Sequence, residues 1–506
     1  MIAVEILRRT GECGFHARMV QQASPICHGP WHAPQDAADA LAHAGHARSG
    51  HGSRNRAPVK IPHLEFPGGL LFERTIQPPE VSGYAGSHHG ERNSVDQQSF
   101  HASFSLAALG ALVRNTLLTY VDPTMRILHV TKYYPPERGG MERYACDLAE
   151  QQAADGHRVH VLCHHGSPGI PRSTETHNGI EVTRLCVRAK IPFVPLAPGM
   201  VRELPALCRR FRPHVIHMHL PNPAVLFTML LPADIPVVVH WQADVGAAST
   251  SRFVRMAYPA YALFERAMLK RADAIIATSP PYLKHSPHLR PFADKCTVIP
   301  LGIRPENYSM PDNAEKTTAP PGQPMVLSLG RFTFYKGFEH LVRAAERYTQ
   351  AQFVLAGDGE TLPAIRELVR TRGLERRVSL PGAVSHDTML QLMRDCTLFC
   401  LPSVDRGEAF GIVLLEAMLF GKPLISTDIP GSGTGWVNQH EQTGLVVPPA
   451  DVPALADAIR RIADNPKLAD QYGRAARKRL ESTFTLSATM DALYSVYHQA
   501  MDARRN

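Results

Sequence analysis

Short apolar runs alternate with longer amphipathic stretches from residue 125 onward. In the first part of this region the runs are rich in Val and Ile and predict buried strands at 127–130, 157–164, 214–219, 236–241 and 272–279. A helix is expected at 141–156, after the Pro/Gly loop YYPPERGG. Strands separated by helices are typical of parallel βαβ units in a sheet that helices cover on both faces.

The same alternation starts again after a polar, Pro-rich stretch at 309–324, which is expected to be a linker or exposed loop. Strands are predicted in PMVLSLG, QFVLAGDG, RVSLPG, LFCLPS, PLISTD and TGLVVPP, and helices at 337–349, 361–372, 387–394, 409–420 and from 452. The fold class is therefore α/β, with two Rossmann-like doubly wound domains. Because ligands bind at the carboxyl ends of parallel strands, the site is expected in a cleft between the domains.

Residues 1–124 differ from the rest of the chain. They hold ten of the 26 His, much Gly, Ser and Pro, and no sustained periodicity. We interpret them as a low-complexity extension, either disordered or upstream sequence wrongly included, with Met125 as the start of the folded protein. The expected domains are then 125–305, 306–485 and a C-terminal helix at 486–506 that can cross back to the first domain.

Composition narrows the class of protein. Of the 506 residues, 44% are hydrophobic and 20% are charged, which is typical of a globular chain with several cores. Nine Cys with no CxxC pair predict reduced thiols, no structural zinc site and a cytoplasmic location. No transmembrane segment is expected, because Pro232, Asp234 and Pro236 interrupt the best apolar run. Nor is a signal peptide expected, since Arg8 and Arg9 follow the short apolar MIAVEIL.

The net charge of +8 is unevenly distributed. Residues 125–305 hold 22 Lys and Arg against 13 Asp and Glu, whereas residues 1–124 and 306–506 are close to neutral. A basic face attracts phosphate, nucleic acid or anionic lipid, although it can also be an ordinary solvated face. No nucleic-acid motif accompanies it, so a nucleic-acid partner is not expected.

The segment RGEAFGIVLLEAM is the strongest candidate for chemistry. Glu408 and Glu416 are separated by seven residues, so along a helix they lie about 12 Å apart. An acid pair of the glycosidase type needs about 5–9.5 Å. The two acids are better suited to gripping distant parts of one extended ligand. The amides of Phe410, Gly411 and Ile412, at the expected helix N-terminus, suit a diphosphate.

Two cations follow the first strand of the second series. Arg331 and Lys336 lie in SLGRFTFYKGF, where they can bind a diphosphate at the carboxyl edge of the sheet. LAGDGE is another strand-end turn. The loop PGAVSH, which contains Val384, can read a base edge through its backbone.

This combination resembles the retaining glycosyltransferases of family 4, which have the GT-B fold. The resemblance covers about residues 125–500 and rests on ILHVTKYYPPERGGMERY, VIPLGI, LSLGRFTFYKG, LAGDGE and EAFGIVLLEAMLFGKPLISTD. One departure is VIPLG where the family usually has VIPNG.

The resemblance implies a role for each matching residue. Arg331 and Lys336 would contact the diphosphate of a nucleotide-sugar donor, Glu416 the ribose, and Glu408 the hydroxyls of the transferred sugar. The donor site would also include Gly140 and the Val384 and Phe410–Ile412 segments.

On the other side of the cleft, Gly139 would lie near the phosphates and the acceptor. The resemblance places His240 close to the sugar, with Asp244 after it, although His240 can instead be a core histidine. His217 and His219 are further acceptor-side candidates.

The implied reaction needs no metal and no other cofactor, because cations and a helix N-terminus can neutralise the leaving diphosphate. The resemblance implies retention of anomeric configuration, with the leaving phosphate oxygen assisting deprotonation of the acceptor. The expected product belongs to cell-surface polysaccharide. The transferred group is a hexosyl group, with mannose favoured, and the sequence does not distinguish GDP-mannose from a UDP-hexose.

A lipid-linked saccharide acceptor is expected at the inner face of the cytoplasmic membrane. The basic face and the apolar run FVPLAPGMV (193–201) would contact anionic lipid. Three alternatives stay open: a sugar-nucleotide epimerase of the same fold, a non-catalytic nucleotide-sugar-binding protein and, on charge alone, a nucleic-acid binder.

Overall fold

The computed structural model describes residues 124–505, apart from 138, 192–193, 245–251 and 310–322. All described residues belong to one compact unit of the chain. The expectations for residues 1–123 and for most of the stretch 309–324 therefore lie outside the described residues. The domain boundaries stay predictions, although the two sheets described below lie on either side of residue 305.

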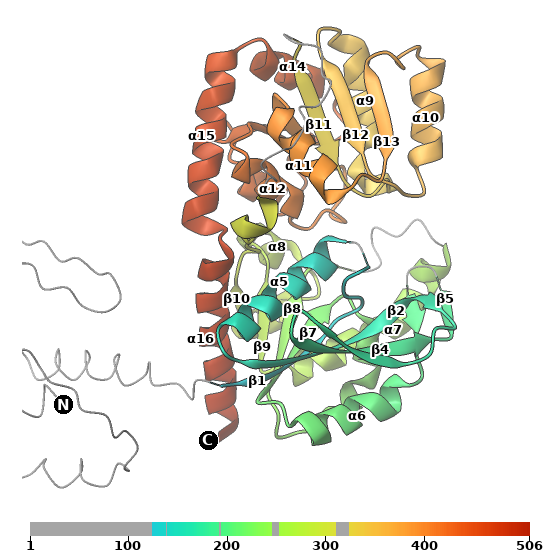
Figure 1. Ribbon diagram of the computed structural model, residues 1–506, viewed down its shortest axis with the longest axis vertical. Helices are drawn as coiled ribbons and strands as arrows, with labels where there is room; N and C mark the ends of the chain where they lie inside the picture. The colour runs from blue at the N-terminus through green and yellow to red at the C-terminus, as the bar shows by residue number, and fades with distance from the viewer. Residues whose placement is uncertain (1–123, 138, 192–193, 245–251, 310–322, 506) are drawn as a thin grey trace, which may run out of the picture. The chain divides into compact units, whose positions relative to one another are not determined.

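The first sheet has eight strands in the order β10-β9-β8-β7-β1-β2-β4-β3 (Figure 1). Its strands are β1 (Arg126–Val130), β2 (Arg158–Pro168), β3 (Ser173–His177), β4 (Ile180–Val187), β7 (Val215–Leu220), β8 (Val237–Trp241), β9 (Ala274–Ala277) and β10 (Cys296–Val298). All neighbours pair in parallel except β3 and β4, which are antiparallel. Five of these strands were predicted from the sequence, whereas β3, β4 and β10 were not. Edge strand β3 is polar and largely exposed, so it carries no apolar pattern.

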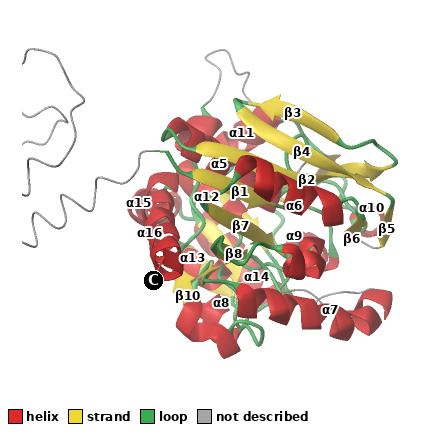
Figure 2. Ribbon diagram, turned by 90° about the horizontal axis from the view of Figure 1, so that it is seen from below, coloured by secondary structure: helices red, strands yellow, loops and turns green. Residues whose placement is uncertain are grey.

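Helices cover both faces of the first sheet (Figure 2). They are α5 (Gly140–Ala154), α6 (Met200–Phe211), η1 (Pro223–Leu230), α7 (Arg252–Arg271), α8 (Pro280–His285), η2 (Arg290–Lys295) and η3 (Pro305–Tyr308), with a small hairpin of β5 (Ala189–Ile191) and β6 (Val194–Leu196). Side chains alternate along each strand, so Leu128 and Val130 pack in the core with α6 and α7. Ile127 packs on the opposite face, in the core that includes Tyr144 of α5.

The second sheet has six parallel strands in the order β13-β12-β11-β14-β15-β16. They are β11 (Met325–Leu329), β12 (Gln352–Ala356), β13 (Val378–Gly382), β14 (Leu398–Leu401), β15 (Leu424–Thr427) and β16 (Gly444–Val447). Its helices are η4 (Phe334–Lys336), α9 (Phe338–Arg347), α10 (Leu362–Thr371), α11 (His386–Asp395), α12 (Ile412–Leu419), α13 (Thr434–Val437), α14 (Val452–Ala463) and α15 (Pro466–Thr483). This strand order reverses between β11 and β14, where a doubly wound sheet opens its ligand crevice.

The last helix, α16 (Leu486–Arg505), packs beside the first sheet (Figure 1). The Tyr497 hydroxyl lies 2.5 Å from Nδ1 of His217 on β7. Near the C-terminus, Arg504 Nε donates to Asp273 Oδ1 at 2.7 Å. The chain therefore returns from the second sheet to the first. Among the described helices, none combines the length and the apolar character needed to cross a membrane.

Candidate functional site

A buried ion pair joins the loops that follow β11 and β14. Lys336 Nζ lies 2.5 Å from Glu408 Oε2, and the Ser403 hydroxyl donates to the same oxygen at 2.9 Å. Both charged side chains are about 10% exposed. Burial lowers and the carboxylate raises the pKa of Lys336, and the net shift is upward, so the amine stays charged. The fold thus brings together two predicted site residues at the point where the strand order reverses.

Gly330 and Arg331 open the loop that carries Lys336. A Cβ at Gly330 would lie 3.1 Å from Lys336 Cε, so glycine leaves room for the lysine side chain. Arg331, the next residue, is exposed. One predicted cation is therefore held in an ion pair, while the other is accessible to an anionic ligand.

The helix after Glu408 begins later than expected. The prediction of a helix over 409–420 is wrong at its start, because α12 begins at Ile412 and Gly411 is its N-cap with φ +80°. Residues 408–409 are instead held as a loop: the Ser432 hydroxyl donates to the Glu408 carbonyl at 2.5 Å, and the Gly433 amide donates to the Ala409 carbonyl at 2.7 Å. The first amides of α12 still lack intrahelical acceptors and can bind an anion.

Phe410 does not offer its side chain to a ligand. It is 3% exposed and packs against the rings of Trp436 and Phe484. Val384, in the β13–α11 loop, is half-buried and packs against the core that contains Tyr308. The predicted donor role of both residues therefore depends on their backbone.

Glu416 lies one turn into α12. The Tyr308 hydroxyl donates to Glu416 Oε1 at 3.0 Å. Burial of the carboxyl raises the pKa of Glu416 to about 7, although Tyr308 and the charges of Arg143 and Lys336 act in the opposite direction. Glu416, which the resemblance places at the ribose, is therefore hydrogen-bonded to a tyrosine that the sequence did not indicate.

The N-terminus of α5 lies beside α12. A Cβ at Gly140 would lie 3.2 Å from Ile412 Cγ2, whereas one at Gly139 would overlap the Glu142 carboxylate. Directly after β1, Lys132 lies within electrostatic reach of Arg331. Burial and that nearby cation lower the pKa of Lys132 to about 8. Sequence reasoning missed Lys132, whose position right after a strand end was the available signal.

The predicted acceptor-side histidines are buried. His217 and His219 are 0% and 3% exposed, and His240 is 1% exposed. The Tyr497 hydroxyl of α16 contacts His217, and His219 contacts His129 of β1. The acceptor-side role of His217 and His219 stays a prediction. His240 packs with them, and its contact with a sugar stays a prediction.

Gln242 is a polar residue that the sequence analysis passed over. It follows β8 at the carboxyl end, and its Nε2 lies 3.4 Å from His219 Nδ1. Its Oε1 is buried without a hydrogen-bond partner among the described residues.

Asp244 is held entirely by protein groups. Its Oδ1 accepts from Trp241 Nε1 at 2.8 Å and from the Ser286 hydroxyl at 2.9 Å. Its Oδ2 pairs with Arg406 at 3.0 Å, two residues before Glu408. The predicted acceptor role of Asp244 is not tested by these contacts, which tie the first sheet to the loop that carries Glu408.

Two groups of side chains in the described part of the chain have the spacing of a metal site. Nitrogen atoms of His129, His217 and His219 lie within 4.8 Å of one another, and so do ligand atoms of Cys146, Glu150 and His177. In the first group His129 Nδ1 lies 2.9 Å from His219 Nε2, which is a hydrogen-bond distance. The contacts present in this group are therefore those of a hydrogen-bonded cluster.

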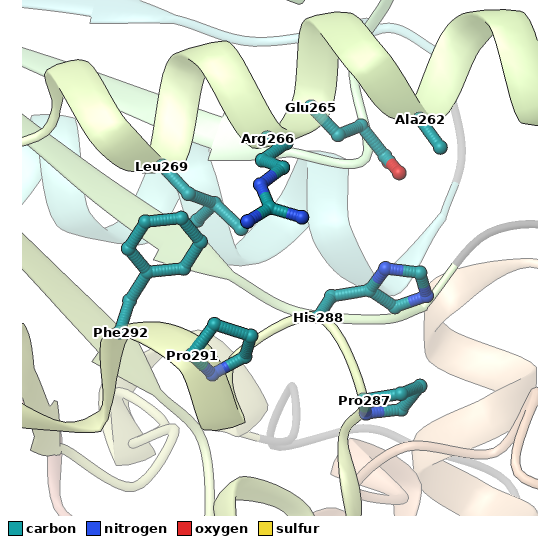
Figure 3. Close-up of a pocket in the computed structure, with 8 residues that line it drawn as sticks. All are labelled: Ala262, Glu265, Arg266, Leu269, Pro287, His288, Pro291 and Phe292. Atoms are coloured by element: carbon teal, nitrogen blue, oxygen red, sulfur yellow. The ribbon is translucent and has the colours of Figure 1, made fainter.

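A separate cavity of about 170 Å³ lies between α7 and the segment 287–292 (Figure 3). The Glu265 and Arg266 side chains of α7 and the His288 ring line it. Glu265 accepts from the Tyr258 hydroxyl at 2.8 Å, and burial raises the pKa of its carboxyl to about 7. None of the predicted site residues lines this cavity.

Comparison with known proteins identifies the family. Residues 139–302 match the family described as glycosyl transferase 4-like domain, and residues 309–479 match glycosyl transferases group 1. The chain is 31% identical over 391 residues to O-antigen chain mannosyltransferase C of Escherichia coli, which covers 75% of this chain and 100% of that protein. It is 31% identical over 366 residues to D-rhamnosyltransferase WbpZ of Pseudomonas aeruginosa, covering 71% and 92% of the two chains.

The fold is also that of solved structures. Sucrose-phosphate synthase from Thermosynechococcus elongatus superposes with a TM-score of 0.63 at 24% identity, covering 75% of this chain and 100% of that one. The predicted fold and family are confirmed. The chain is a glycosyltransferase that belongs to family 4 and has the GT-B fold.

Proposed function

We propose that this enzyme transfers a hexosyl group, with mannose favoured, from a nucleoside-diphosphate sugar to a lipid-linked saccharide during cell-surface polysaccharide assembly. The observation that carries the donor site is the buried Lys336–Glu408 pair at the carboxyl ends of β11 and β14. The relatives that act on mannose and rhamnose support the choice of sugar and product class.

The charges around this pair suit a departing diphosphate. Arg331 is exposed, and Lys132 lies near it on the opposite sheet. These cations, with the amides that open α12, would stabilise the leaving group. A phosphate that draws Lys336 would also free Glu408 Oε2 to accept a hydroxyl of the sugar. Because the leaving phosphate oxygen would assist deprotonation of the acceptor hydroxyl, transfer with retention would need no protein nucleophile.

Nucleotide release from GDP- and UDP-sugars, with a membrane lipid extract as acceptor, tests this proposal. We expect turnover with one donor, dependent on the extract, and a loss of at least about 100-fold in Glu408→Gln because the sugar contact is weakened. The exposed Glu375→Gln is the matched control. Conversion of the donor without any acceptor would instead identify an epimerase. Donor binding without turnover would identify a non-catalytic binding protein.

We further propose that the enzyme docks on anionic lipid through η1 and α7, which contact each other. Met229 and Leu263 are 90% and 69% exposed, and Met256 of α7 is also exposed. Arg266 and Lys270 lie exposed on the same helix. Apolar side chains beside cations fit a membrane surface. The run at 193–201 is less suited than expected, because Met200 is fully buried and Ala197 is 7% exposed in the core under α6.

Co-sedimentation with phosphatidylglycerol vesicles checks the docking surface. We expect binding that falls with salt, and a loss of at least about 10-fold when Met229 and Leu263 are both replaced by Asp, because apolar area no longer leaves water. Ile170 and Val201 are exposed apolar residues elsewhere, and replacing both by Asp is the control. Equal loss in both variants, or no binding at low salt, would contradict the proposal.

A further inference from the structure

Seven buried or partly buried side chains on one face of the first sheet form an unbroken chain of hydrogen bonds. Four are histidines from three neighbouring strands, and their register places them side by side. The successive contacts are Gln242 Nε2 to His219 Nδ1 at 3.4 Å, His219 Nε2 to His129 Nδ1 at 2.9 Å, His129 Nε2 to Gln152 Oε1 at 2.6 Å, Gln152 Nε2 to the Tyr497 hydroxyl at 3.2 Å, Tyr497 to His217 Nδ1 at 2.5 Å, and His217 Nε2 to His240 Nδ1 at 3.3 Å.

The Gln152 amide gives the chain one direction. Its Oε1 accepts from His129, so His129 is protonated on Nε2 and its Nδ1 accepts from His219. The Nε2 of Gln152 donates to the Tyr497 hydroxyl, which then donates to His217 Nδ1. Each neutral imidazole therefore receives a hydrogen bond at Nδ1 and carries its proton on Nε2, and His129, His217 and His219 donate from that nitrogen. The arrangement is self-consistent from the first residue to the last.

Both ends of the chain are open. His240 Nε2 and Gln242 Oε1 are buried and have no hydrogen-bond partner among the described residues. The direction of the hydrogen bonds makes His240 Nε2–H a donor and Gln242 Oε1 an acceptor. A buried polar atom without a hydrogen-bond partner destabilises the protein, so both atoms gain from a ligand that supplies the complementary groups.

The open ends lie close to the donor site. His240 lies on β8, and Gln242 follows the end of that strand. Both side chains contact His219, His240 by ring stacking with centroids 5.9 Å apart and Gln242 through its Nε2, so they lie on one face. The His240 ring packs edge-to-face on Tyr144 of α5, with centroids 5.3 Å apart. Tyr144 is one turn from Gly140, which faces Ile412 of α12. Burial lowers the pKa of His240 to about 3, which keeps the ring neutral at physiological pH.

The resemblance already implies that His240 contacts the sugar. We propose that this hydrogen-bond chain fixes the direction of that contact, with His240 Nε2–H as the donor to one hydroxyl of a hexose, and that Gln242 Oε1 accepts from a neighbouring hydroxyl. Gln152 and Tyr497 are positioning residues that act through the histidines. Through Tyr497, the C-terminal helix α16 contributes to a site on the first sheet. The sugar contact rests on the proposed function, whereas the polarity of the chain is a property of the protein alone.

Histidine ¹⁵N NMR on the selectively labelled full-length protein tests the polarity without any substrate. We expect His129, His217, His219 and His240 all to be neutral and protonated on Nε2. In Gln242→Glu the carboxylate can only accept from His219, so the chain should reverse and protonate the four rings on Nδ1. Wild-type rings already protonated on Nδ1, or rings unaffected by Gln242→Glu, would overturn the proposal. So would a stoichiometric transition metal on these rings, because it would occupy the accepting lone pairs.

Tyr497→Phe tests the link to α16. Removing the hydroxyl leaves His217 Nδ1 without its donor, so we expect mixed tautomers at His217 and His240. We also expect about 10-fold weaker discrimination between a hexose donor and its deoxy analogues. Tyr494, on the same helix as Tyr497, donates its hydroxyl to Asp155 at the end of α5. Tyr494→Phe is therefore the control and should leave both readouts unchanged. Unchanged tautomers in Tyr497→Phe would overturn the role of Tyr497, whereas altered tautomers in an enzyme that shows no sugar transfer would count against the proposed function alone.

Discussion

Replacing Lys336 with Met is expected to lower kcat by about 10²- to 10³-fold and the free energy of unfolding by about 3 kcal/mol. The first effect follows from the loss of a cation that would neutralise the leaving diphosphate. The second follows because Glu408 would keep a buried charge with only the Ser403 hydroxyl beside it. Steady-state kinetics and urea unfolding measure the two effects separately.

The double variant Lys336→Met with Glu408→Gln separates folding from catalysis. Removing both charges leaves no unpaired buried ion, so stability should return to within about 1 kcal/mol of the wild type. Activity should stay low, because neither the cation nor the carboxylate is restored. A single Lys336→Met variant with normal kcat, or a stable double variant with normal kcat, would exclude the pair from the reaction.

Acidification from pH 7 to pH 5 is expected to lower the free energy of unfolding by several kcal/mol. Burial holds the pKa values of five histidines well below the ordinary 6.5: about 4 for His129 and His164, about 3 for His240, and lower than normal for His217 and His219. Below pH 6.5 the unfolded chain binds protons that the native state excludes, so stability falls with pH down to the native pKa values. For His129 alone, the whole pKa shift from 6.5 to about 4 corresponds to roughly 3 kcal/mol of unfolding free energy, of which roughly 2 kcal/mol is lost by pH 5.

Two buried glutamates act in the opposite direction over the same range. The pKa values of Glu265 and Glu416 are raised from 4.5 to about 7, so the native state binds more protons than the unfolded chain between these values. Their contribution to stability is therefore present at acid pH and is lost as pH rises to about 7. Because the effect of five histidines exceeds that of two glutamates, acidification should lower the free energy of unfolding.

Urea unfolding at pH 7, 6 and 5 checks this balance. Between pH 6 and pH 5 the unfolded chain protonates His164 and the native state does not. His164→Gln removes this difference, so the fall of the unfolding free energy with pH should become less steep by about 1.4 kcal/mol per pH unit. The same substitution at the exposed His440 is the control. Stability that does not change between pH 7 and pH 5 would mean that the buried rings accept protons without unfolding.

Much of the fold could be predicted because its signals are local. The runs that form β1, β7, β8 and the central strands of the second sheet are mostly apolar and almost fully buried, as is typical of parallel strands between helices. β3 was missed because a polar edge strand has no burial pattern. The start of α12 was placed three residues too early, because Phe410 looks like part of the helix whereas the Ser432 and Gly433 contacts hold that stretch as a loop.

The candidate site was predictable in its membership and less so in its contacts. Arg331 and Lys336 were singled out by their position after a strand, and Glu408 and Glu416 by their spacing around the start of a helix. That Lys336 binds Glu408, across 72 residues of sequence, was not. Lys132 and Gln242 were missed, because a single polar residue after a strand is common and only its neighbours in space give it a role.

The sequence by itself determined the alternation of most strands and helices and the charged residues that follow the first strand of the second series, and its motifs carried the resemblance to the family. The alternation depends on neighbouring positions in the chain, through burial periodicity, and the expected site depends on the requirement that ligands meet the carboxyl ends of strands. Only the tertiary structure decided that His217 and His240 are buried and that Tyr497, 280 residues from His217, is bonded to it. Burial and hydrogen-bond direction are set by groups from distant segments, and no local pattern in the chain records which of them come together.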